Sequence, residues 1–217
     1  MTTKPLSLEH LLRPSNLSEK APAIIMLHGF GSDENDLFSF APELPENYLI
    51  ISVKAPYAMQ PYGNAWYEIN FDASNTKFSN VEQAVESRKK IEKFIDEVIE
   101  NYPVDASKIT LLGFSQGSIL SYAVALSNPK KIQQVVALSG YVDENMLREN
   151  YRENDFSNLR IYASHGTVDQ VIPVEWARKT KPFLDKLNIE NSYSEFPVGH
   201  GVAPNNFFEF KQWLEAE

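Results

Sequence analysis

The 217-residue sequence has no cysteine, no long apolar run and no excess of basic charge. Without cysteine, the chain forms no disulfide and offers no thiolate for catalysis or zinc binding. None of its apolar stretches approaches the roughly 20 residues that cross a lipid bilayer. The polar segment 1–20 contains no signal-peptide core. We therefore expect a cytoplasmic protein with no integral membrane association.

The charge balance is acidic. There are 29 acidic and 20 basic residues, which gives a net charge of −9. Binding to a nucleic acid would need clustered lysine and arginine, and binding to an anionic membrane would also need basic residues. The densest basic run, residues 88–90, falls in a predicted helix among several acidic residues, as on a solvated, salt-bridged face. We expect no nucleic-acid partner.

Common metal and nucleotide motifs are also missing. The four histidines form no H-E-x-x-H pattern, and neither G-x-x-x-x-G-K nor G-x-G-x-x-G occurs. These absences disfavour a zinc-peptidase site and a phosphate-binding loop.

What the chain does contain is an alternation of strands and helices from about residue 23 onward. Apolar content of 43% and charged content of 23% suit a soluble globular domain. Short apolar strands are predicted at residues 23–27, 48–53, 109–112, 135–139, 161–165 and 193–196. Helices are predicted at residues 79–101, 118–128, 176–187 and 205–214. With no repeat or linker, this predicts one α/β domain over 1–217, with a mostly parallel sheet and helices on both faces.

Residues 113–117, Gly-Phe-Ser-Gln-Gly, form the only G-x-S-x-G in the chain. They join a predicted buried strand to a predicted helix, which is the setting of a nucleophile elbow. Side chains in place of Gly113 and Gly117 would collide with the neighbouring strand and helix. The pattern also occurs by chance, so a plain strand-to-helix turn that carries a serine is the alternative. Ser115 is the candidate nucleophile.

A serine nucleophile needs a histidine base, and the histidine needs a carboxylate to orient it. On such sheets the acid and then the histidine follow the serine along the chain. Only His165 and His200 follow Ser115, and His200 lies between two glycines after the last predicted strand. Asp169 lies between Ser115 and His200, in the loop after strand 161–165. We predict a Ser115–Asp169–His200 triad, with Asp169 as a turn residue or helix cap as the alternative, and a structural His165 bonded to its own loop.

Acyl transfer also needs backbone N–H groups that stabilise the oxyanion. One donor should be the N–H of Gln116, directly after the nucleophile, and the other should come from the loop after an early strand. The glycine-containing segment 27–32 is that loop, with the N–H of Phe30 as candidate. A plain glycine-rich turn is the alternative.

Four segments together resemble a known family. Residues 27–37, 113–117, 165–173 and 199–201 are similar to signature segments of the phospholipase/carboxylesterase family of α/β-hydrolases, which includes the acyl-protein thioesterases. The resemblance implies the same triad and oxyanion hole, and hydrolysis of acyl esters or thioesters without cofactor or metal. Lysophospholipase, peptidase and non-catalytic ligand-binding functions on this fold remain alternatives, and a homodimer remains open.

The acyl site is the least defined part. The family commonly has a tryptophan followed by an aromatic residue near the acyl group, here Trp66 and Tyr67, whereas residues 68–71 differ from the expected pattern. We predict that Trp66, Tyr67 and Phe114 bind substrate beside Phe30, with Tyr141 as a further candidate; core packing is the alternative for each. About twenty residues separate strands 135–139 and 161–165, too few for a large cap domain. We therefore expect an accessible site.

Overall fold

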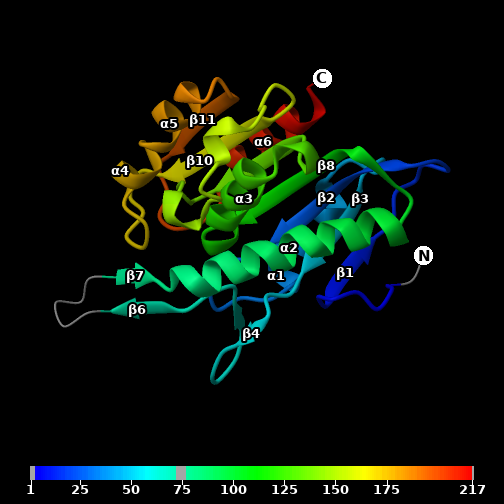
Figure 1. Ribbon diagram of the computed structural model, residues 1–217, viewed down its shortest axis with the longest axis horizontal. Helices are drawn as coiled ribbons and strands as arrows, with labels where there is room; N and C mark the ends of the chain where they lie inside the picture. Colours follow the sequence, from blue (N-terminus) through cyan, green and yellow to red (C-terminus); the bar gives the residue numbers. More distant parts are fainter. Residues whose placement is uncertain (1–2, 72–76, 217) are drawn as a thin grey trace.

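The computed structural model describes residues 3–71 and 77–216. A seven-stranded sheet forms its centre, in the order β1-β3-β2-β8-β9-β10-β11 (Figure 1). β1 is an antiparallel edge strand, and the other six strands run parallel. The strands are β1 His10–Arg13, β2 Ala21–Leu27, β3 Leu49–Val53, β8 Val104–Phe114, β9 Gln134–Leu138, β10 Arg160–Gly166 and β11 Glu190–Phe196.

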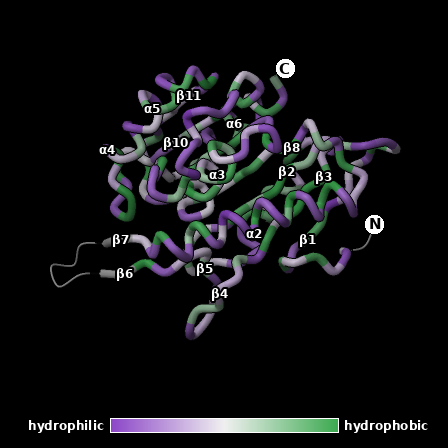
Figure 2. Tube along the Cα trace, viewed as in Figure 1, coloured by the Kyte–Doolittle hydropathy of each residue, from purple (hydrophilic) through white to green (hydrophobic). Residues whose placement is uncertain are grey.

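The central strands are apolar on both faces because both faces are covered. In β2, Ile25 and Leu27 face one hydrophobic cluster, and Ile24 and Met26 face the other. α2, α3 and α5 contribute to the first cluster, and α1 and α6 border the second. Figure 2 shows the contrast between the apolar central strands and the mixed character of α2. The predicted α/β architecture with helices on both faces is confirmed. The helices are α1 Asn35–Phe38, α2 Val81–Asn101, α3 Gln116–Ser127, α4 Val174–Ala177, α5 Thr180–Lys186 and α6 Pro204–Glu215.

The helix predicted over 176–187 is in fact two helices, α4 and α5. Pro182 explains the break. A proline has no N–H for the bond to the carbonyl four residues earlier, and it is tolerated only in a helix's first turn. The second helix therefore begins at Thr180, so that Pro182 lies in its first turn.

Short elements complete the chain. The connection between β9 and β10 holds only two 3-10 helices, and Met146 and Tyr151 anchor them in the core, so no large cap is built there. Two small hairpins not predicted from the sequence are β4 Tyr57–Ala58 with β5 Asn64–Ala65, and β6 Ile69–Phe71 with β7 Lys77–Ser79. The second hairpin projects away from the sheet (Figure 1). The 3-10 helices are Ala41–Glu43, Pro129–Lys131, Glu144–Met146 and Tyr151–Glu153.

The start of α3 packs directly against β2, which explains the need for glycine at position 117. A Cβ atom added to Gly117 would lie 1.9 Å from the carbonyl oxygen of Leu27. We expect Gly117→Ala to lower the free energy of unfolding by about 3 kcal/mol, since backbone must shift to admit the methyl group. Urea unfolding measures this. Gly199→Ala is the control because a Cβ there meets nothing within 4 Å; equal stability of the two variants would contradict the close packing.

Candidate active site

Ser115 sits on the sharp turn between β8 and α3. Its φ angle of 53° lies in the left-handed region, which is strained for a residue with a side chain and is common at functional sites. Two backbone hydrogen bonds hold the turn. The Ser115 N–H donates to the Leu138 carbonyl (2.8 Å), and the Ser115 carbonyl accepts from the Ile119 N–H (3.1 Å). The turn presents the Ser115 side chain to a cavity.

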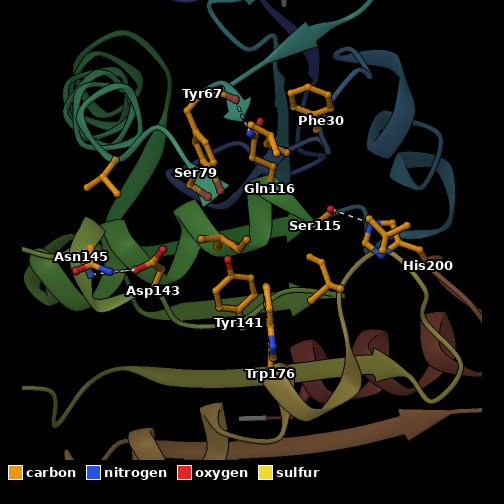
Figure 3. A pocket seen from close by; sticks show the side chains of 15 residues that line it. Phe30, Tyr67, Ser79, Ser115, Gln116, Tyr141, Asp143, Asn145, Trp176 and His200 are labelled. Atoms are coloured by element: carbon orange, nitrogen blue, oxygen red, sulfur yellow. Dashed lines mark hydrogen bonds between the residues drawn. The ribbon is translucent and has the colours of Figure 1, made fainter. Parts of the chain in front are cut away.

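His200 connects Ser115 to Asp169. Its Nε2 is 2.8 Å from the Ser115 Oγ, and its Nδ1 is 2.7 Å from the Asp169 Oδ2. Figure 3 shows the imidazole pointing at the serine. The three residues follow β8, β10 and β11, whose carboxyl ends meet at one edge of the sheet. The structure therefore brings together the three side chains that the sequence predicted as a triad.

The Asp169 carboxylate is buried and held by several donors. Its Oδ1 accepts hydrogen bonds from the backbone N–H groups of Val171 (2.8 Å) and Ile172 (2.9 Å). Burial alone would raise the pKa of Asp169, but the hydrogen bonds from His200 and from these two N–H groups outweigh it and hold the pKa below its usual value. The carboxylate is therefore ionised at neutral pH and can stabilise a positive charge on His200.

His165 is buried beside the same carboxylate. Its Nε2 lies 2.8 Å from the Ile172 carbonyl, so this nitrogen carries the proton and donates within its own loop, as predicted. The same Nε2 is 3.2 Å from the Asp169 Oδ2, a contact that the sequence did not indicate. His165 thus fixes the loop that bears Asp169.

The loop that carries Phe30 faces the elbow from the end of β2. The His28 side chain ties it to its surroundings, since Nε2 accepts from the Ala55 N–H (3.0 Å). Gly31 donates from its N–H to the Asn64 carbonyl (2.9 Å). Within residues 3–71 and 77–216, neither the Phe30 N–H nor the Gln116 N–H donates to another backbone carbonyl. The two N–H groups thus lack a described backbone acceptor, as donors to an oxyanion must.

The Gln116 side chain has a structural role that the sequence did not indicate. Its Oε1 accepts from the Trp66 N–H (2.8 Å), and its Nε2 donates to the Tyr67 carbonyl (2.8 Å). The buried amide therefore holds residues 66 and 67 against the elbow through one accepted and one donated hydrogen bond to their backbone.

We expect Gln116→Ala to lower the free energy of unfolding by about 2–4 kcal/mol, because it leaves a buried N–H and a buried carbonyl of residues 66 and 67 without partners. Gln116→Glu keeps the acceptor for Trp66 but places a buried carboxylate oxygen against the Tyr67 carbonyl, so it should also be less stable than the parent protein. Chemical unfolding of both variants checks this; an alanine variant as stable as the parent protein would mean that the amide bonds contribute nothing.

A cavity of about 530 Å³ opens beside Ser115. Apolar and aromatic side chains form most of its wall, and polar groups from β7 and from the loop after β9 line it as well (Figure 3). The side chains that line it are Phe30, Tyr67, Ile69, Ser79, Val81, Ser115, Gln116, Ile119, Tyr141, Asp143, Asn145, Val171, Ile172, Trp176 and His200.

Two of the three predicted substrate-binding residues lie elsewhere. Trp66 is fully buried and does not line the cavity. Its indole N–H donates to the His28 carbonyl (3.0 Å), so it supports the loop that carries Phe30. Phe114 also does not line the cavity. Its ring packs against the His200 imidazole, with the two ring centroids 5.0 Å apart. Only Tyr67 of the three lines the cavity, together with Phe30 and Tyr141.

Several lining residues were not predicted, among them Asp143, Asn145 and Trp176. They lie after β9 and β10, and loops at the carboxyl ends of parallel strands are where ligand contacts concentrate. That rule was the available signal for them.

Two further properties bear on what this site can do. The described part of the chain holds no cluster of three or more histidine, cysteine or acidic residues arranged to bind a metal ion. Every helix within it is too short or too polar to span a lipid bilayer.

Comparisons with known proteins place the chain among related sequences and folds. Residues 14–217 match the model of the family described as Phospholipase/Carboxylesterase. Acyl-protein thioesterase 1 of Candida albicans is 29% identical over 91% of each chain, and that of Debaryomyces hansenii is 25% identical over 89% of this chain and 90% of its own. A Bacillus cereus carboxylesterase structure shares the fold with a TM-score of 0.84 at 17% identity, covering 96% of this chain and 94% of its own. Acyl-protein thioesterase 2 of Zea mays superposes with a TM-score of 0.75 at 18% identity, covering 95% of this chain and 97% of its own. The chain therefore belongs to the phospholipase/carboxylesterase family of α/β-hydrolases.

Proposed function

We propose that this protein hydrolyses carboxylic acyl esters or thioesters through Ser115, His200 and Asp169, by way of an acyl-enzyme. The observation that carries the proposal is the continuous hydrogen-bonded chain from the Ser115 Oγ through the imidazole to the buried Asp169 carboxylate. This is the arrangement that makes a serine hydroxyl nucleophilic at neutral pH. The substrate class follows from the family and from relatives named acyl-protein thioesterases.

In the first half-reaction, the Ser115 Oγ attacks the carbonyl carbon of the substrate while its proton moves to the His200 Nε2. The Asp169 carboxylate stabilises the imidazolium that forms and keeps its Nδ1 proton in place. The tetrahedral intermediate then collapses. His200 gives the proton to the departing alcohol or thiol, and the acyl group remains on Ser115.

In the second half-reaction, water replaces the alcohol. The water oxygen attacks the acyl-enzyme carbonyl while His200 takes a proton from that water. His200 then gives the proton to the Ser115 Oγ as the acyl–serine bond breaks. In both steps the negative oxygen lies against the N–H groups of Phe30 and Gln116. Each such donor contributes roughly 3–4 kcal/mol in a well-studied protease.

A panel of substrates tests the proposed class. Hydrolysis of p-nitrophenyl esters and acyl thioesters of rising acyl length should proceed with the parent protein and fail with Ser115→Ala. Peptide p-nitroanilides with matching acyl parts should react far more slowly if the protein is an esterase. Preferential anilide cleavage would indicate a peptidase, and no turnover of any member would indicate a binding protein.

A further inference from the structure

The cavity beside Ser115 has two different ends (Figure 3). His200 lies on one side of Ser115, and Tyr67, Ser79, Tyr141 and Asp143 lie on the other. In serine hydrolysis the leaving group must be near the histidine that protonates it. The acyl group therefore extends the other way, toward the polar end.

Asp143 is the only Asp, Glu, Lys or Arg among the described residues that line this cavity. Its Oδ1 accepts hydrogen bonds from the backbone N–H of Asn145 (3.0 Å) and from the Asn145 side chain (2.9 Å). Within residues 3–71 and 77–216, the carboxylate forms no ion pair. It therefore carries a negative charge toward the cavity that no described side chain neutralises.

Two aromatic side chains, Tyr141 and Trp176, line the same cavity as this carboxylate. The rings of Tyr141 and Trp176 meet edge to face with centroids 5.2 Å apart, and both line the cavity. Burial and then the charge of Asp143 raise the pKa of Tyr141 to about 12, so its hydroxyl stays neutral. A carboxylate next to neutral aromatic rings is the combination that favours a cation, through charge attraction and cation–π contacts.

We propose that the acyl group processed by this enzyme carries a cationic end, such as an ammonium group, which binds between Asp143 and the rings of Tyr141 and Trp176. This inference rests on the proposed function, because it places the acyl group on Ser115. An adjoining hollow shares these three residues and adds Glu144 and Lys179. Glu144 is paired with Arg152 (2.6 Å). Neither Glu144 nor Lys179 lines the acyl cavity itself, where Asp143 is the one Asp, Glu, Lys or Arg among the described lining residues.

The test compares three p-nitrophenyl esters with the same leaving group. One carries the 4-(trimethylammonio)butanoyl group, one carries its neutral isostere 5,5-dimethylhexanoyl, and one is the anionic glutaric monoester. Each kcat/KM is divided by the rate constant for hydroxide-catalysed hydrolysis of the same ester. We expect the cationic ester to exceed the isostere at least tenfold, and the anionic ester to be the poorest substrate.

The variant Asp143→Asn should bring the cation-to-isostere ratio close to one while hydrolysis of the neutral ester continues. Asparagine keeps the oxygen that accepts from Asn145, so the loop stays capped. Glu175→Gln is the control, since it removes the same charge from an exposed neighbour outside the cavity lining, and it should leave the ratio unchanged.

A parent ratio of one or less, with Ser115-dependent hydrolysis of the neutral ester, would overturn this inference and leave the proposed function standing. A high ratio that persists in Asp143→Asn would also overturn the assignment to Asp143. Undiminished hydrolysis by Ser115→Ala would instead overturn the proposed function on which the inference rests.

Discussion

Ser115→Ala is expected to lower kcat for p-nitrophenyl ester hydrolysis by about a millionfold, as loss of the nucleophile does in a serine protease. Without the Oγ no acyl-enzyme forms, and His200, 2.8 Å away, has no hydroxyl to deprotonate. Steady-state measurement of kcat for the purified variant and the parent protein gives the size of the loss. The unfolding temperature should change little, because the substitution removes one hydroxyl from the wall of a cavity.

Ser118→Ala is the matched control for this result. Ser118 lies one turn further along α3, is fully buried, and faces Gly140 rather than His200. Its variant should retain near-parental kcat. If Ser115→Ala kept more than a few per cent of the parental rate, the nucleophile would have to be another group.

Asp169→Asn has the second largest expected effect, a loss of about ten-thousandfold in kcat. The amide has the size of the carboxylate, but it cannot stabilise the imidazolium with a full charge, and it can offer an N–H to Nδ1, which favours the wrong tautomer of His200. Initial-rate kinetics at saturating ester check this.

The same variant separates the two roles considered for Asp169. Its Oδ1 accepts from two backbone N–H groups, as a simple turn cap would, and asparagine performs that task about as well as aspartate. Near-full activity of Asp169→Asn would therefore reduce Asp169 to a turn residue. Asp155→Asn, at an exposed turn with a comparable Asp-to-N–H bond, controls for capping alone.

The sheet and the placement of Ser115, Asp169 and His200 could be predicted because they depend on strong local signals. Buried parallel strands are continuous apolar runs, and loops at their carboxyl ends meet at one edge. The order of serine, acid and histidine along the chain then left few candidates.

The acyl cavity could not be predicted in the same way. Trp66 and Tyr67 are adjacent, yet one supports the Phe30 loop and the other lines the cavity. Which of them faces the cavity depends on two hairpins whose strands are only two or three residues long, too short to show a periodic pattern. The Gln116 amide, which fastens this segment, is likewise visible only through its tertiary partners.

If Ser115 is the activated nucleophile, a fluorophosphonate probe should label it. Intact mass measurement and peptide mapping of the labelled protein check this. We expect one adduct per chain, located on Ser115, absent from Ser115→Ala and formed much more slowly in Asp169→Asn. No adduct, or an adduct on another residue, would contradict it.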